Sequence, residues 1–218
     1  TEQSQQLVEA LYTEYLDVLN RHFEHYPYLL GWKPCIGDFG LLAPMYAHLG
    51  RDPHPASLMQ KRALRVYRWV ERMNRADQDV PEFFTPGTDF LENDEVPETL
   101  MAVLRAVAED FVPETRAAAE RINDWLSQQQ PEAGAAAVGR LGNLLGRAEF
   151  SVRGQSITAL ASPYRFYLLQ RVQAIYAGLP LDEQASVEHM LQACGMQEML
   201  SIKLDRSIGR ADNLEVWL

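Results

Sequence analysis

Residues 27–49 read PYLLGWKPCIGDFGLLAPMYAHL, and this stretch decides how the chain folds. Pro27 predicts the end of a preceding helix, and residues 31–34 predict a tight turn. From Cys35 onward the apolar residues recur at helical spacing, so a new helix is expected to begin there. Its first turn carries Asp38, whose carboxylate can accept unpaired backbone N–H groups and interacts favourably with the helix dipole. The stretch therefore predicts a turn followed by a capped helix.

This stretch resembles the helical C-terminal domain of the glutathione S-transferase family, and the resemblance extends over residues 1–74. Members of that family often carry Pro-[Phe/Tyr]-Leu-[Leu/Ala]-Gly, a short gap and Ser-Ile-[Ala/Gly]-Asp-[Phe/Ile], which residues 27–31 and 35–39 resemble. The family's Ser or Thr is a capping hydroxyl, so the resemblance implies a structural helix cap made by Cys35 and Asp38. Because a thiol is a weak acceptor, we expect the half of the cap that depends on Cys35 to be weak. A simpler interpretation is that an acidic residue in a first helical turn only offsets the helix dipole.

The composition is that of a globular protein. The 218 residues are 47% hydrophobic and 23% charged, which suffices for a substantial core. The net charge of -10 argues against a general nucleic-acid or anionic-membrane surface, because both require a basic face. Cys35 and Cys194 lie far apart without metal-ligand spacing, so we expect reduced thiols and no metal site. No apolar run reaches the roughly 18 residues of a membrane span. We therefore expect a cytoplasmic protein with no nucleic-acid or membrane partner.

Hydrophobic periodicity predicts a mainly α fold. Helices are expected at residues 5–25, 35–49, 56–74, 98–129 with an interruption near Pro113, 162–178 and 182–193. A loosely specified helix is expected at 133–145, a β-hairpin at 149–153 and 156–160, and either a short terminal strand or a packed extension at 213–218. The resemblance adds that residues 1–93 are a glutathione S-transferase C-terminal-like helical bundle without the family's first helix. Residues 94–218 are then a mostly helical extension that packs on it.

Three of these helices have patterns that predict their burial. The first helix carries a wide apolar stripe formed by Leu7, Leu11, Tyr15, Val18 and His22. Because the family's first helix is missing, we expect this stripe to be exposed and to bind a partner. The helix at 35–49 is apolar on most sides and is the expected central buried helix. The helix at 56–74 should direct its cations to solvent, paired with acids rather than forming a nucleic-acid patch: Lys61, Arg62, Arg65, Arg68 and Arg72.

The resemblance implies a function divided between two domains. In glutathione transferases, glutathione binds to a thioredoxin-like domain that also carries the catalytic residue, and residues 1–218 show no such pattern. This chain would contribute the hydrophobic cosubstrate pocket and part of a homodimer surface, and an upstream thioredoxin-like domain or partner chain would supply the glutathione chemistry. A fragment is accordingly favoured over a stand-alone helical protein. The substrate-binding candidates are Tyr12, Tyr15, Phe39 and Tyr46, although core packing explains each of them more simply.

Few residues indicate chemistry within this chain itself. No GxSxG, HExxH, P-loop or dinucleotide fingerprint occurs, so no catalytic residue is assigned. His22 and His25 lie at a helix end before Pro27, which fits a surface position near the helix dipole better than a metal site. Cys35 at a helix N-terminus has reactive potential, but Asp38 opposes a second negative charge beside it.

Two functions from different classes remain. The first is the helical part of a glutathione transferase-like enzyme that acts on a hydrophobic electrophile, with glutathione bound in a domain outside residues 1–218. The second is a non-catalytic helical module that binds a protein partner. They differ in whether glutathione binding and turnover return when a thioredoxin-like domain is supplied.

Overall fold

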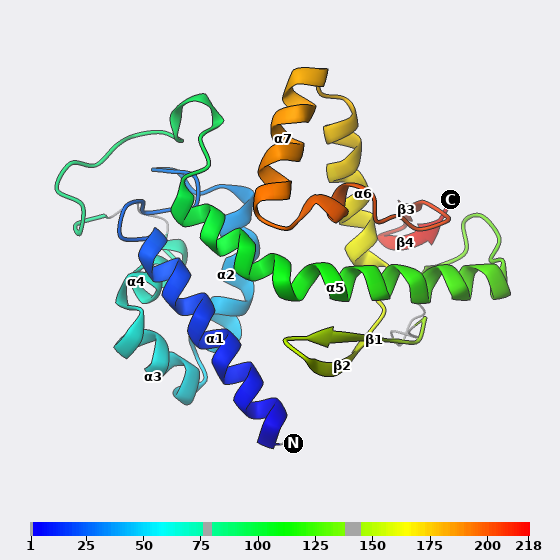
Figure 1. Ribbon diagram of the computed structural model, residues 1–218, viewed down its shortest axis with the longest axis horizontal. Coiled ribbons are helices and arrows are strands. Elements are labelled where there is room, and N and C mark those ends of the chain that lie inside the picture. Colours follow the sequence, from blue (N-terminus) through cyan, green and yellow to red (C-terminus); the bar gives the residue numbers. More distant parts are fainter. Residues whose placement is uncertain (1, 76–79, 138–144) are drawn as a thin grey trace. The chain divides into compact units, whose positions relative to one another are not determined.

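The computed structural model describes residues 2–75, 80–137 and 145–218, which form two compact units, Thr1–Ala106 and Val107–Leu218. The described chain is mainly helical and carries two small antiparallel hairpins (Figure 1). The boundary between the units falls within helix α5 (Glu98–Gln129), so this helix contributes turns to both.

The first unit consists of helices and turns. Helix α1 (Glu2–His22) is followed by a turn, by α2 (Ile36–Pro44) and by one π-helical turn (Met45–Leu49). Helices α3 (Pro53–Arg62) and α4 (Leu64–Met73), a short 3-10 turn (Glu92–Asp94) and the first turns of α5 complete it. The largest fully buried side chains come from the α1 segment, α3 and α4, and they form the core: Leu16, Leu19, Phe23, Met59, Val66, Trp69 and Val70. The rings of Phe23 and Trp69 stack with centroids 5.2 Å apart.

The predicted helix at 56–74 is wrong in one respect, because the structure has two helices there. The backbone of Ala63, with φ -135° and ψ 61°, is not helical and separates α3 from α4. Ala63 is fully buried, so tertiary packing imposes a bend at a residue whose own helix propensity is high.

The apolar stripe of α1 is covered, contrary to the prediction. The Tyr15 hydroxyl donates to the backbone carbonyl of Ala106 (3.2 Å), and His22 Nδ1 lies 2.9 Å from the Thr99 hydroxyl. Thr99 and Ala106 both belong to the first turns of α5, which lie beside α1 within this unit (Figure 1). These turns occupy the position that the prediction left empty, and they contact His22, which is fully buried.

Helix α2 is not the central buried helix that its composition predicts. Within α2 only Asp38 is buried, and in the following turn only Met45 is. The core is already filled by side chains of α1, α3 and α4, so α2 lies against one side of it and leaves most of its apolar residues in solvent.

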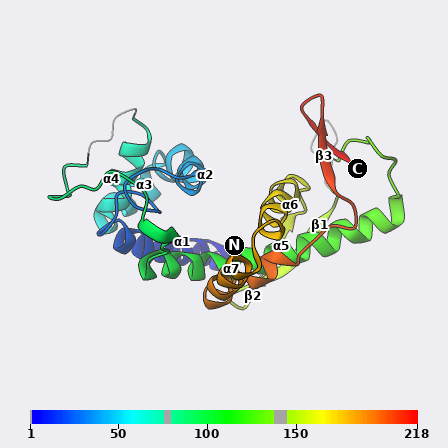
Figure 2. The same ribbon diagram turned by 90° about the horizontal axis from the view of Figure 1, so that it is seen from above.

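The second unit gathers around the C-terminal part of α5. Strand β1 (Arg147–Val152) pairs antiparallel with β2 (Gln155–Leu160), and β3 (Ile208–Ala211) pairs antiparallel with β4 (Leu214–Trp217). Between them, α6 (Tyr164–Ala177) and α7 (Leu181–Ala193) form a helical hairpin, and a 3-10 turn (Gln197–Leu200) follows (Figure 1 and Figure 2). The core contains Ile122, Leu126, Ala161, Phe166, Ile208 and Trp217.

The predicted hairpin at 149–160 is confirmed, and the predicted terminal strand is half of a second hairpin.

The predicted interruption near Pro113 is wrong, because α5 is continuous. Val112 and Thr115 on either side of Pro113 are buried, and the Thr115 hydroxyl donates to the Phe111 carbonyl (2.7 Å). Packing on both sides of Pro113 thus compensates for the loss of the backbone hydrogen bond that proline cannot donate.

The loosely specified helix predicted at 133–145 is wrong for its described part, residues 133–137. This segment lies along β4 instead: the N–H of Gly134 donates to the Trp217 carbonyl (2.8 Å) and the N–H of Ala137 to the Glu215 carbonyl (2.8 Å). Residues 138–144 lie outside the described residues. Strand pairing with a distant segment thus overrides a local composition rich in alanine.

Candidate functional site

The N-terminus of α2 is organised by the buried carboxylate of Asp38. Its oxygens accept hydrogen bonds from the backbone N–H of Cys35 (2.9 Å), the backbone N–H of Leu29 (3.2 Å) and the indole N–H of Trp69 (2.9 Å). These three donors compensate for the hydration that the carboxylate loses on burial. They also connect the turn before α2, the start of α2 and the middle of α4.

Cys35 occupies the N-cap position of α2. Its sulfur faces the backbone N–H of Asp38 while the Asp38 side chain accepts from the Cys35 N–H, which together make a reciprocal capping box. Burial, assisted by the negative charge of Asp38, raises the pKa of the half-buried Cys35 thiol. The thiol therefore stays protonated near neutral pH, and its surroundings suit a structural cap better than a nucleophile.

His22 does not lie on the surface, contrary to the prediction. It is fully buried, with Nδ1 2.9 Å from the Thr99 hydroxyl and Nε2 3.2 Å from the Tyr28 carbonyl. Since a carbonyl only accepts, Nε2 carries the proton and Nδ1 accepts from the hydroxyl. Burial lowers the pKa of His22, so the ring is neutral at neutral pH.

Arg72 is buried as well, whereas the helical pattern placed it in solvent. Its guanidinium donates to the Pro27 carbonyl (2.8 Å) and to Glu82 (2.7 Å), and it lies 5.3 Å from the centre of the Tyr28 ring. The strong attraction of the guanidinium for these groups draws it inward. Other cations of this segment form exposed ion pairs, as expected: Arg62 with Asp17, Arg65 with Glu24 and Arg68 with Glu82.

The four candidate substrate-binding aromatics occupy different environments. Tyr15 is half-buried and bonded to α5, and Phe39 is 58% exposed on α2. Tyr46 lies in the π-helical turn, with the Arg51 guanidinium 5.6 Å from the centre of its ring. Tyr12 is the member of the four that lines an apolar groove.

This groove lies between α1 and α3 and has a volume of about 410 Å³. Its walls are mainly apolar and include Val8, Tyr12, Leu49, Pro55 and Leu58. The Tyr12 hydroxyl donates to the Pro55 carbonyl (3.0 Å), and burial raises its pKa to about 12, so the phenol stays neutral. The size and character of the groove suit a small apolar molecule.

The outward face of α2 carries exposed apolar side chains. Ile36 is 91% exposed and Phe39 58% exposed, and Gly40, Ala43 and Pro44 are exposed beside them. The one charged side chain of the helix, Asp38, points into the unit. The helix thus has its polar side in and its apolar side out, which is typical of a surface that another protein surface covers.

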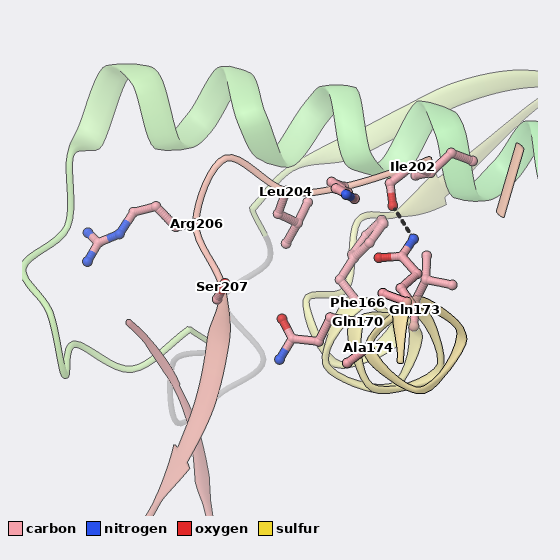
Figure 3. Close-up of a pocket in the computed structure, with 11 residues that line it drawn as sticks. Phe166, Gln170, Gln173, Ala174, Ile202, Leu204, Arg206 and Ser207 are labelled. Atoms are coloured by element: carbon pink, nitrogen blue, oxygen red, sulfur yellow. Dashed lines mark hydrogen bonds between the residues drawn. The ribbon is translucent and has the colours of Figure 1, made fainter. Parts of the chain in front are cut away.

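The second unit contains a cavity of about 290 Å³ between α6 and residues 202–207 (Figure 3). The Gln173 amide donates to the carbonyls of Met199 (2.8 Å) and Ile202 (2.9 Å), and Gln170 bonds the backbone of Ile208. The Arg206 guanidinium points away from α6 in Figure 3 and donates to the Leu218 carbonyl (2.8 Å). These groups hold backbone segments together. In the sequence, the feature that could have indicated Gln170 and Gln173 is the presence of two glutamines three residues apart on an otherwise apolar helix.

The described residues contain no group of three or more His, Cys, Asp or Glu side chains placed to hold a metal ion. Within the same part of the chain, no helix combines the length and hydrophobicity that crossing a membrane requires. Comparisons of the sequence and structure with protein-family models, curated proteins and solved structures find no match.

Proposed function

We propose that the first unit is the helical domain of a glutathione transferase-like protein, in which the outward face of α2 packs against a thioredoxin-like domain. That domain would bind glutathione and carry the group that activates its thiol. The first unit would contribute the wall of a hydrophobic cosubstrate pocket, for which the groove beside Tyr12 has suitable size and lining.

The observation that carries this proposal is the inverted polarity of α2. Covering Ile36 and Phe39 would contribute roughly 1.5–3 kcal/mol each from the hydrophobic effect. The capping box and the three hydrogen bonds to Asp38 hold α2 rigidly, so the apolar face is presented in one orientation. The turn and cap are also the residues on which the sequence resemblance rests.

The test compares residues 1–218 with the full reading frame that encodes them. We expect the full protein to be larger by about 100 residues, one thioredoxin-like domain and a helix. It should bind glutathione in a calorimetric titration and conjugate it to an electrophilic aryl halide, whereas residues 1–218 alone should do neither. Glutathione binding or turnover by residues 1–218 alone would show that the chemistry is wrongly assigned.

Two substitutions in the full protein test the role of α2. Phe39→Asp should lower kcat/KM at least tenfold, because it places a charge in the domain contact. Phe84→Asp is the matched control, since Phe84 is a fully exposed aromatic residue of the same unit outside α2, and it should leave kcat/KM unchanged. A full protein without a thioredoxin-like domain would favour the other function, a helical module whose α2 face binds a protein partner.

A further inference from the structure

Helix α6 has a second apolar face that its own unit does not cover. Tyr164, Leu168, Val172 and Ile175 recur at helical spacing, and all four are exposed, Ile175 to 69%. The opposite side of α6 carries the buried Phe166 and the glutamines that line the cavity. We call these four exposed residues the α6 stripe. They form a face of α6 that is separate from the side that packs against the core.

Charges around the α6 stripe are divided between the two helices of the hairpin. The charged residues of α6 are both cations, Arg165 and Arg171, and the acidic residues of α7 are Asp182, Glu183 and Glu188, with no Lys or Arg. Arg165 already pairs with Glu114. In the described part of the chain, Arg171 forms no ion pair; the Arg171 guanidinium lies 5.7 Å from the centre of the Tyr167 ring. A surface that is basic on one helix and acidic on the next is complementary to a copy of itself turned through 180°.

We propose that the α6–α7 hairpin is a self-association surface, on which the α6 stripes of two copies pack antiparallel and each α6 also contacts α7 of the other copy. The hairpin loop lies between Ala177 and Leu181, so a two-fold axis near the middle of the stripe brings Glu188 of one copy level with Arg171 of the other. Arg165 comes level with Glu183 in the same arrangement. Apolar contact at the centre is then flanked by opposite charges.

The size of this surface sets the expected strength of association. Helices of 13 and 14 residues are each about 20 Å long, so the hairpin offers a face of about 400 Å² per copy. The total of about 800 Å² lies below the range of stable complexes, so we expect a reversible dimer with a dissociation constant in the micromolar range. This surface lies in the second unit and is independent of the function proposed for the first.

The experiment is sedimentation equilibrium of residues 1–218 from about 1 µM to about 500 µM. The average mass should rise from 24.8 kDa towards twice that value. Ile175→Asp should keep the protein at 24.8 kDa throughout, because it places a charge in the centre of the contact. Circular dichroism checks that this exposed substitution leaves the fold intact. The matched control is Ile36→Asp, which alters an isoleucine on α2 that is even more exposed (91%) and should leave the mass profile unchanged.

A charge exchange tests the predicted pairing. Arg171→Glu should weaken association at least tenfold, and adding Glu188→Arg to it should restore the original dissociation constant to within a few-fold. A mass of 24.8 kDa at every concentration would overturn the proposal. So would association that is lost with Ile36→Asp and kept with Ile175→Asp, which would assign the contact to α2. Failure of the double substitution to recover association would overturn the two-fold arrangement.

Discussion

Three buried polar side chains hold the backbone of the turn that precedes α2. Each comes from a different helix and binds one of three consecutive residues: Arg72 binds Pro27, His22 binds Tyr28 and Asp38 binds Leu29. A turn carries few apolar contacts of its own, so hydrogen bonds to rigid helices supply its order. Two of the three side chains were expected at the surface: Arg72 from the helical pattern, and His22 from its position at a helix end before Pro27.

The neutral, buried His22 makes stability depend on pH. Because its pKa is lowered in the folded protein, the unfolded chain binds a proton at pH values where the folded chain does not. The stabilisation is fully present above the unfolded pKa of about 6.5 and is lost as pH falls through the folded pKa. We expect the free energy of unfolding to fall by up to about 1.4 kcal/mol per pH unit below pH 6.5 from this group.

Urea titrations at pH 7.5 and pH 5.5 measure this dependence. His22→Gln keeps a side chain that can donate to the Tyr28 carbonyl but cannot titrate, so its loss of stability between these pH values should be smaller than that of the unmodified protein. His54→Gln is the control for the replacement of an exposed histidine. Equal pH dependence in all three proteins would contradict the assignment to His22.

At the scale of the elements, two glycines with open surroundings show how backbone conformation decides the effect of one substitution. Gly154 lies in the two-residue turn between β1 and β2 with φ of +78°, and Gly40 lies within α2. A Cβ added to either meets nothing within 4 Å. Any difference between the two sites therefore arises from the backbone and not from contacts.

Gly154→Ala should destabilise the protein by about 1 kcal/mol, because an L-residue is strained at positive φ. Gly40→Ala should stabilise it by about 0.5–1 kcal/mol, because alanine lowers the entropy of the unfolded chain and favours the helix. The measurement is the urea midpoint of each variant, with circular dichroism as the signal. Effects of the same sign at both sites would contradict the conformations described for these glycines.

At the scale of the whole molecule, the chain consists of two compact units with their own cores, connected through α5. The first core is formed by α1, α3 and α4, and the second contains the buried Ile122 and Trp217. Because the cores are separate, a destabilising substitution in one unit should lower the stability of that unit much more than that of the other.

Asp38→Ala tests this independence. Removing the carboxylate leaves three buried or partly buried N–H donors without their acceptor, at a cost of about 3 kcal/mol or more. In hydrogen exchange, amides of α4 should exchange about 100-fold faster, and those of α6 and of β1 to β4 should be unchanged. Asp52→Ala is the control and should alter neither unit, because Asp52 is exposed and its side chain makes no capping hydrogen bond to α3. Faster exchange in both units would show that they unfold as one.

Local signals in the sequence determined much of this protein. The spacing of apolar residues, Pro27 at the end of the first helix and the gap at 154–155 between the two expected strands predicted the main helices and the first hairpin, because these features depend on neighbours in the chain. The structure places the turn of the hairpin one residue earlier, at 153–154. The likeness to glutathione transferases stays a prediction. Only the tertiary structure decided which faces are covered: α5 covers the stripe of α1, α2 keeps its apolar side in solvent, and Arg72 turns inward. Burial depends on segments that are distant in sequence, and a helical pattern shows that a face is apolar without showing what packs against it.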